Sequence, residues 1–378
     1  MDQADPALVV NEFADSVRNK FKKSSSAAPL SAPSNRLRYT CGSAEECLDA
    51  DLPNIFSSWR VALLRPSQTR QDSSCFDIPA TDAGLPLTGI VWTPCAAAAS
   101  EVALGGGVVL PGVRDCPISG NRLPLIVVSH GRRGSFFAHN DTAAADAGFV
   151  VAAINHPGDN ARDSSRTDEF SVLVERPADM KRLTDFMLGA WKEAAVLDPQ
   201  RIGLFGFSRG AYTGLVVIGG NPDFGALAAL CQQAGAATPK CEAIRAGRVP
   251  TAVPVHDPRI RAAILADPPV FEGLFSRERL AGVTIPLLLW RSSLGGDGVT
   301  PDAIDALEQL LPRRPDYRIV ANSVHFSFIA PCPPALAKAV PVLCTDPPGF
   351  DRVAFHNEFN DAAVAFFRTH LRFGNRPP

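Results

Sequence analysis

The feature that most constrains the fold is the stretch Arg201–Gly210, RIGLFGFSRG, in which an apolar run leads directly into the five residues GFSRG. An apolar run of this length predicts a buried strand. The residues after it match the G-x-S-x-G pattern of a strand-turn-helix connection that presents a nucleophilic serine. The two glycines allow a tight turn without a Cβ clash, and Ala211–Ile218 is predicted as the helix that follows. The stretch therefore predicts Ser208 as a nucleophile at the carboxyl end of a strand.

Apolar runs of strand length recur on both sides of this stretch, and segments of helical character separate them. Strands are predicted at Trp59–Leu64, Cys75–Ile78, Leu87–Trp92, Leu123–Ser129, Phe149–Ile154, Ile260–Ala266, Ile285–Trp290 and Tyr317–Ala321. Helices are predicted at Asn140–Ala147, from about Ala178 to Val196, from Pro301, and over a final amphipathic segment through Phe355 and Phe366. This alternation predicts an α/β fold with a mostly parallel central sheet and helices on both faces. Ligands then bind at the carboxyl ends of the strands.

A serine hydroxyl is a weak nucleophile and needs a general base beside it. Histidine, with an unperturbed pKa of about 6.5, suits that task near neutral pH. Where a serine occupies such a turn, the acid and the base follow it along the chain in that order. Of the seven histidines, His325 follows the last predicted strand and is the candidate base. His356 and His370 lie on or near the terminal helix and are interpreted as surface residues.

An oxyanion hole needs two backbone N–H groups aimed at the position where negative charge develops. One comes from the residue after the nucleophile, and the other comes from the loop after an earlier strand of the sheet. In this chain these positions are occupied by Arg209 and by Arg132, which lies in the loop after Leu123–Ser129. The backbone amides of Arg132 and Arg209 are therefore the candidate oxyanion donors.

Further candidates for substrate contact follow the predicted strands directly. They are His130, Gly131, Arg133 and His156. The alternative for the two histidines is that they pack beneath the cleft. The guanidinium groups near the serine either favour esters that carry a carboxylate or phosphate, or pair with Asp and Glu side chains.

From about Cys75 to Leu371 the chain resembles the bacterial predicted dienelactone hydrolases, which are allied to the platelet-activating-factor acetylhydrolase family of α/β-hydrolases. The matching stretches are LPLIVVSHGRRGS, GFVVAAINHPGDN, RIGLFGFSRGAYTG, DPRIRAAILADPP, NSVHFSF and AFHNEFNDAAVAFFRTHL. The resemblance implies an α/β-hydrolase fold and a serine esterase that hydrolyses carboxylic esters, including lipid or aromatic esters, through Ser208 and His325 without a metal or cofactor. The alternatives are an acyltransferase of the same fold and a catalytically silent binding protein.

Two aspartates compete for the role of triad acid, because each follows a predicted strand. Asp267 comes directly after Ile260–Ala266, and Asp297 lies in the glycine-rich segment after Ile285–Trp290. The acid must reach the distal nitrogen of the base in order to hold its tautomer. The resemblance favours Asp267, since DPRIRAAILADPP aligns with the acid-bearing segment of the acetylhydrolase family. Asp297 remains the alternative.

Eight of the nine cysteines fall into close pairs, and Cys75 is left over. The pairs are Cys41 with Cys47, Cys95 with Cys116, Cys231 with Cys241, and Cys332 with Cys344. No C-x-x-C or paired-histidine spacing indicates a metal, so the last three pairs are predicted to be disulfides. Disulfides indicate a periplasmic or secreted protein, as does the resemblance, because family members are often exported. Residues 1–30 show no apolar segment of signal-peptide length, and a cytoplasmic enzyme with free thiols is the alternative.

Length and charge bound the remaining possibilities. The 378 residues, 46% of them hydrophobic, suit one large domain at 71–378 preceded by a partly flexible extension and linker at 1–70. Residues 219–254, between the nucleophile and the acid, are a candidate cap or lid insertion, with a surface loop as the alternative. The net charge of −2 without a basic stripe predicts no nucleic-acid partner, and no apolar run approaches the length of a membrane span.

Overall fold

The computed structural model describes residues 75–82, 84–97, 100–105, 108–113, 116–139, 141–226, 231, 239–249 and 253–372. The predicted extension at 1–70, the strand at Trp59–Leu64 and the pair Cys41–Cys47 lie outside these residues.

A mostly parallel sheet of eight strands forms the centre of the molecule, in the order β1-β2-β6-β5-β7-β8-β9-β10. Its strands are β1 (Cys75–Ile78), β2 (Leu87–Trp92), β5 (Leu123–Ser129), β6 (Val150–Asn155), β7 (Leu197–Phe207), β8 (Ile260–Ala266), β9 (Leu287–Ser292) and β10 (Asp316–Val320). Only β2 pairs antiparallel, with β1 on one side and β6 on the other, and the remaining pairs are parallel. This architecture confirms the predicted fold class.

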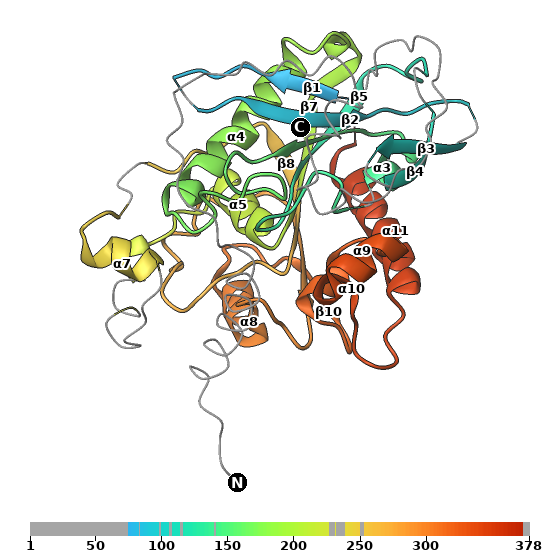
Figure 1. Ribbon diagram of the computed structural model, residues 1–378. Coiled ribbons are helices and arrows are strands. Elements are labelled where there is room, and N and C mark those ends of the chain that lie inside the picture. The colour runs from blue at the N-terminus through green and yellow to red at the C-terminus, as the bar shows by residue number, and fades with distance from the viewer. Residues whose placement is uncertain are drawn as a thin grey trace, which may run out of the picture.

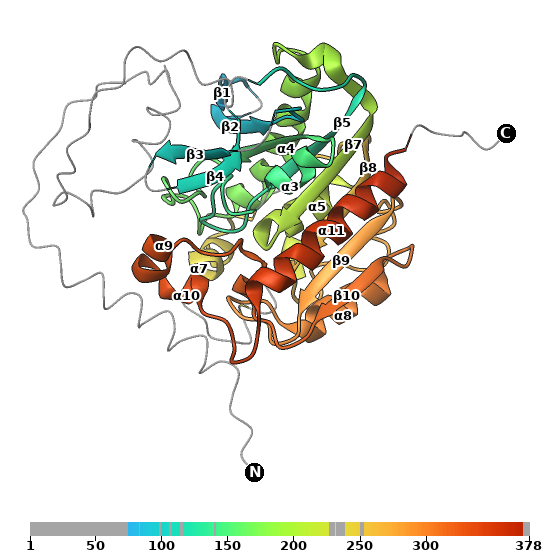
Figure 2. The same ribbon diagram turned by 90° about the vertical axis from the view of Figure 1, so that its right-hand side faces the viewer.

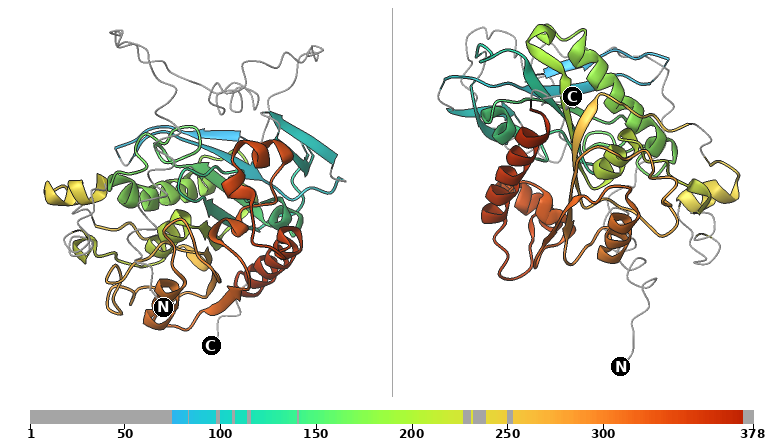
Figure 3. Two further views of the ribbon diagram at one scale, coloured as in Figure 1. Left: turned by 60° about the horizontal axis from the view of Figure 1, so that its bottom comes forward. Right: turned by 180° about the vertical axis from the view of Figure 1, so that it is seen from behind.

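Helices cover both faces of this sheet (Figures 1 and 2). One face packs against α4 (Ser171–Leu188), α5 (Arg209–Val217) and α8 (Pro301–Leu310). The other packs against α3 (Asp141–Asp146) and α11 (Arg352–His370), which lies obliquely across the strands in Figure 2. The view from behind in Figure 3 shows the sheet between α11 and the α4–α5 pair.

The continuous apolar runs follow from this two-sided cover. Every residue of β5 is buried. Leu125 and Val127 contribute to the core on the α4–α5 side, whereas Ile126 and Val128 contribute to the core beneath α11. Because successive side chains of a strand point to opposite faces, a strand covered on both faces is apolar nearly throughout, and the one polar side chain of β5, Ser129, comes last and is hydrogen-bonded to His156.

The structure differs from the predictions in two segments. A separate antiparallel hairpin, β3 (Ser100–Gly105) with β4 (Val108–Gly112), occupies the glycine- and proline-rich region before β5. Helix α4 begins at Ser171 rather than near Ala178 and ends at Leu188 rather than at Val196, and Pro177 lies inside it. Proline has no N–H to donate to the carbonyl four residues earlier. The Tyr212 hydroxyl lies 3.5 Å from that carbonyl, Leu173 O, and partly replaces the missing donor.

Short elements complete the described chain: η2 (Ala194–Val196), α7 (Pro239–Arg245), η3 (His325–Phe328), α9 (Pro334–Ala339) and α10 (Pro341–Cys344). The three predicted disulfides are present, as Cys95–Cys116, Cys231–Cys241 and Cys332–Cys344, and Cys75 is a free thiol. Among the described residues, no helix is long and apolar enough to cross a membrane.

Candidate active site

Ser208 lies in a sharp turn between β7 and α5. Its backbone has φ 53° and ψ −125°, a conformation that non-glycine residues rarely adopt, and its N–H donates to the carbonyl of Ala266 on β8. Both neighbouring glycines are required by close contacts. A Cβ on Gly206 would lie 2.3 Å from Gly210 O, and a Cβ on Gly210 would lie 1.9 Å from Ser129 O. The turn thus presents Ser208 at the carboxyl end of β7, directly before the amino terminus of α5.

His325 faces Ser208 from the loop after β10. Its Nε2 lies 2.9 Å from Ser208 Oγ. The backbone N–H of His325 donates to Gly295 O, and the ring stacks on Phe207 with centroids 4.8 Å apart. These contacts hold the buried imidazole in one orientation.

Asp267, the first residue after β8, completes a hydrogen-bonded row. Its Oδ2 lies 2.7 Å from His325 Nδ1, and the N–H and hydroxyl of Ser292 donate to its two carboxylate oxygens. Since the carboxylate only accepts, Nδ1 carries the proton and Nε2 is free to accept from the Ser208 hydroxyl. Asp297 is instead exposed, in a turn closed by reciprocal hydrogen bonds between Gly296 and Val299. The geometry therefore brings Asp267, and not Asp297, to His325.

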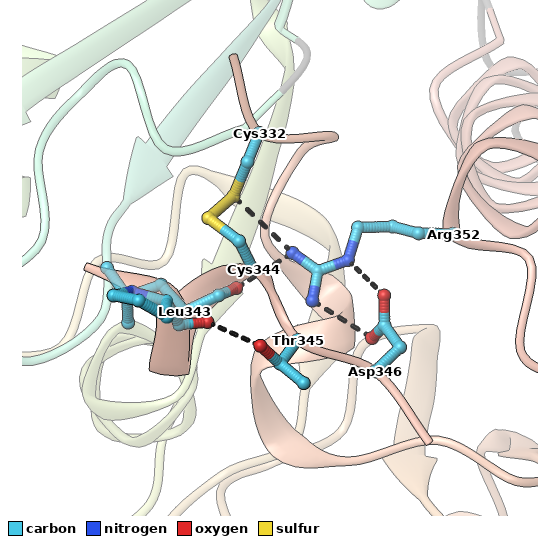
Figure 4. Close-up of a disulfide and its surroundings, with 7 residues drawn as sticks. Cys332, Leu343, Cys344, Thr345, Asp346 and Arg352 are labelled. Atoms are coloured by element: carbon cyan, nitrogen blue, oxygen red, sulfur yellow. Dashed lines mark hydrogen bonds and ion pairs between the residues drawn. A yellow bond between two sulfur atoms is a disulfide. The ribbon is translucent and has the colours of Figure 1, made fainter. Parts of the chain in front are cut away.

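The segment after His325 is anchored by an ion pair and a disulfide (Figure 4). Ser327 Oγ donates to Asp346, which is paired with Arg352 at 2.7 Å. Arg352 also donates to Leu343 O, next to the Cys332–Cys344 bridge. His356 is 4% exposed and lies 3.0 Å from Ser327 O, so its interpretation as a surface residue is wrong.

The loop after β5 lies directly against the nucleophile. A Cβ on Gly131 would be 3.2 Å from Ser208 Cβ, so the backbone of this loop approaches the serine closely. Gly134 N–H donates to Gly131 O across a turn in which Arg133 has φ 53°. On the other side Arg209 is the first residue of α5, where helix amides have no partner within the helix. Both predicted oxyanion segments therefore flank Ser208.

Comparison with known proteins gives a fold rather than a family. No protein-family model matches the chain, and no curated protein matches its sequence. Among solved structures, a ferulic acid esterase from Streptomyces cinnamoneus matches 78% of this chain and 86% of its own, at 20% identity and a TM-score of 0.50. The sheet order and this likeness decide the architecture. The chain has the α/β-hydrolase fold.

Two further solved structures that match are named as a carboxylesterase and a dienelactone hydrolase. A carboxylesterase from Lactobacillus plantarum matches 80% of this chain and 99% of its own, at 15% identity and a TM-score of 0.46. A dienelactone hydrolase from Anabaena variabilis matches 79% of this chain and 98% of its own, at 13% identity and a TM-score of 0.44. At such identities the activity of this α/β-hydrolase fold has to be argued from its own site.

The arginine side chains around Ser208 are paired with carboxylates. Arg132 and Arg133 lie 2.7 and 3.5 Å from Asp168. Arg209 lies 2.8 Å from Asp159. This arrangement is the second of the two interpretations made from the sequence.

His130 and His156 are 1% and 0% exposed, so they pack beneath the loop after β5 and have no surface with which to meet a substrate. His130 Nε2 accepts from the backbone N–H of His156, which leaves Nδ1–H to donate to Gly131 O at 2.7 Å. Burial, together with Arg176, lowers the pKa of His130 to about 3 and keeps the ring neutral. Of the predicted substrate contacts, Gly131 and Arg133 remain beside the site.

A second Ser-His-Asp row lies inside the molecule. Ser129 Oγ is 3.0 Å from His156 Nε2, and His156 Nδ1 is 3.0 Å from Asp179 Oδ2. The three residues are 0%, 0% and 4% exposed, so no substrate reaches them. Arg176 also donates to Ser129 Oγ, which directs the serine proton to His156. This row supports the end of β5 and is not a second active site.

Sequence reasoning missed Asp159 and Arg176, which are both buried near the oxyanion segments. Asp159 follows β6 in the stretch INHPGDN, so its place at the carboxyl end of a strand was a usable signal. Arg176 lies in the part of α4 that precedes Pro177, where no helix was predicted, and its sequence neighbours carry no such signal.

A cleft of about 880 Å³ lies between the beginning of α4 and helix α7. Phe170, Val174, Ala243 and Val249 contribute apolar surface, and Asp168, the partner of Arg132, lies on its lining. Helix α7 belongs to the segment 219–254, which therefore borders this cleft. The Arg132–Asp168 pair connects the cleft to the loop after β5, whereas Ser208 and His325 are not part of its lining. Within the described parts of the chain, no group of three or more His, Cys, Asp and Glu side chains is arranged to hold a metal ion.

Proposed function

We propose that the protein is a serine esterase that hydrolyses carboxylic esters through Ser208, His325 and Asp267. The observation that carries this proposal is the continuous hydrogen-bonded row at the carboxyl edge of the sheet, with 2.9 Å between Ser208 Oγ and His325 Nε2 and 2.7 Å between His325 Nδ1 and Asp267 Oδ2. A nucleophile, a base and an orienting acid at these distances are the parts that acyl transfer needs.

The first half of the reaction forms an acyl-enzyme. Ser208 Oγ attacks the ester carbonyl carbon while its proton passes to His325 Nε2, and Asp267 stabilises the imidazolium that results. The carbonyl oxygen becomes negatively charged and accepts hydrogen bonds from the amides of Arg132 and Arg209. The C–O bond to the alcohol then breaks, and His325 returns its proton to the departing oxygen.

The second half repeats these steps with water. His325 takes a proton from the attacking water, a second tetrahedral oxyanion forms in the same place, and the acid product leaves as Ser208 regains its proton. No metal or organic cofactor is needed for any step.

The substrates best suited to this site are neutral esters with a bulky apolar or aromatic group. The cleft between α4 and α7 is large enough for such a group, since pockets that bind drug-sized ligands have volumes of about 300–1,000 Å³. The four carboxylates on its lining, Asp168, Glu169, Glu175 and Glu242, and the pairing of the nearby guanidinium groups favour neutral over anionic esters. The name of the Streptomyces structure suggests esters of ferulic acid as test compounds.

The three disulfides support placing this activity in an oxidising compartment, the periplasm or the outside of the cell.

Labelling with a fluorophosphonate, together with turnover of p-nitrophenyl esters of graded chain length and of methyl ferulate, tests the proposal. Wild-type protein is expected to be labelled and to hydrolyse at least one ester, and Ser208→Ala is expected to lose both. The matched control is Ser276→Ala. The hydroxyl of Ser276 donates to Glu278, away from the site. A folded wild-type protein that is neither labelled nor active on any ester, or a Ser208→Ala variant that is labelled like the wild type, would overturn the proposal.

A further inference from the structure

A buried carboxylate lies at the meeting point of the two segments that flank Ser208. Asp159 is 0% exposed and lies between β6 and α4. Its Oδ1 accepts from the backbone N–H of Arg133 at 3.3 Å, and its Oδ2 accepts from the Arg209 guanidinium at 2.8 Å. Arg133 belongs to the oxyanion loop after β5, and Arg209 follows the nucleophile. One side chain therefore contacts both segments.

Arg176 connects the same carboxylate to a second point of the oxyanion loop. Its Nη1 donates to Asp159 Oδ2 at 2.6 Å, and its Nη2 donates to the carbonyl oxygen of His130 and to Ser129 Oγ. The guanidinium is 1% exposed, so it cannot move to water without opening the core. The backbone before Arg132 is thereby tied to Asp159 through Arg176.

The electrostatics of the cluster make Asp159 its central member. Two buried guanidinium groups share this one carboxylate, and the Thr167 hydroxyl also donates to it. Burial by itself would raise the pKa of Asp159, but Arg176 and Arg209 hold that pKa well below its usual range, so the group is ionised at neutral pH. Without the negative charge, Arg176 and Arg209 would face each other as unpaired buried cations.

We propose that Asp159 is a positioning residue for ester hydrolysis, holding the amides of Arg132 and Arg209 at the spacing that an oxyanion requires. This inference rests on the proposed esterase function. Asp159 has no exposed surface with which to touch the substrate, and it acts through the two backbone segments that it joins. Oxyanion donors stabilise a charge that exists only in the transition state and in the tetrahedral intermediates. Their displacement therefore lowers kcat with little change in KM.

The test compares Asp159→Asn with Asp198→Asn. Asp198 is also a buried aspartate in an ion pair, with Arg122, but it lies near the amino-terminal end of β7, far from Ser208. In Asp159→Asn we expect kcat to fall by about 10²-fold at nearly constant KM, the loss typical of a displacement of about 1 Å in the site. In Asp198→Asn we expect lower thermal stability and a wild-type kcat.

Inhibition by a trifluoromethyl ketone distinguishes positioning from stability. Ser208 adds to such a ketone and forms a tetrahedral oxyanion, so its inhibition constant depends on the two amides. We expect this constant to rise in Asp159→Asn by about the factor by which kcat/KM falls, a change that a lower melting temperature alone would not cause. A folded Asp159→Asn protein with kcat and inhibition constant within twofold of the wild type would overturn the inference.

If Asp159→Asn does not fold, Arg209→Gln decides the question, because it removes one bond to the carboxylate and leaves the Arg176 pair in place. The expected result is again a weaker trifluoromethyl ketone complex and a lower kcat, and an unchanged inhibition constant would refute the role. A wild-type enzyme without labelling or turnover would instead refute the esterase proposal, and the positioning inference with it.

Discussion

Replacing the carboxylate of Asp267 by an amide tests the proposed triad at a fully buried side chain whose two oxygens are both hydrogen-bonded. The side chain is 0% exposed, and its hydrogen-bond partners are donors: the N–H and hydroxyl of Ser292 and Nδ1 of His325. Asparagine has a single acceptor oxygen. If its NH₂ faces His325, Nδ1 must accept, the ring proton moves to Nε2, and the base can no longer take the Ser208 proton.

The other orientation of the amide also fails. Its NH₂ would face the N–H of Ser292, leaving a buried donor unpaired at a cost of about 1–3 kcal/mol. We therefore expect the first orientation and a fall in kcat of about 10⁴-fold, which corresponds to about 5.4 kcal/mol of transition-state stabilisation. KM should change little, because the ester itself does not contact Asp267.

The assay is kcat and KM for an ester that the wild type hydrolyses, with circular dichroism and thermal unfolding to show that the variant is folded. The matched control is Asp297→Asn, at an exposed turn position with φ 48°, where asparagine is well tolerated. It should retain kcat within twofold. A folded Asp267→Asn enzyme with more than a tenth of wild-type kcat, or a loss confined to Asp297→Asn, would refute the assignment of the acid.

Three further predictions concern stability. His130 is neutral in the folded protein with a pKa of about 3 and titrates near 6.5 when unfolded. Its stabilisation of the folded state is therefore complete above pH 6.5 and decreases as the pH falls toward 3. From pH 7 to pH 5, the free energy of unfolding measured in urea should fall by about 2 kcal/mol less in His130→Gln than in the wild type. An equal fall in the two proteins would contradict the argument. Gly210→Ala places a methyl group 1.9 Å from Ser129 O and should lower the free energy of unfolding by about 3 kcal/mol or prevent folding, whereas a wild-type melting temperature would show that the turn can relax. Changing both cysteines of Cys332–Cys344 to serine should lower the free energy of unfolding by about 3 kcal/mol, an expectation that an unchanged urea midpoint would exclude.

The sequence by itself determined the strands of the sheet, the fold class and the turn that carries Ser208. These features depend on local chemistry. Apolar runs without polar positions predict strands buried on both faces, and two glycines around a serine predict a turn in which backbones touch. The contacts at Gly206 and Gly210 show why the pattern is so short and so readable. Local sequence patterns gave a wrong helix start near Pro177: the helix was predicted to begin after the proline, but it starts six residues before it.

Only the tertiary structure decided which side chains meet. Asp267 and Asp297 both follow strands, and the choice between them depends on which one the sheet places beside His325, which is 58 residues beyond Asp267 in the chain. Asp159 lies 50 residues from Arg209, and no periodicity or turn pattern joins the two. His130 and His156 were likewise readable as lining the cleft or as packing beneath it until their burial was known. Local patterns specify where the backbone turns and which face is covered. The pairing of buried charges is settled by packing between distant segments, because desolvated groups must find their partners wherever the fold brings them together.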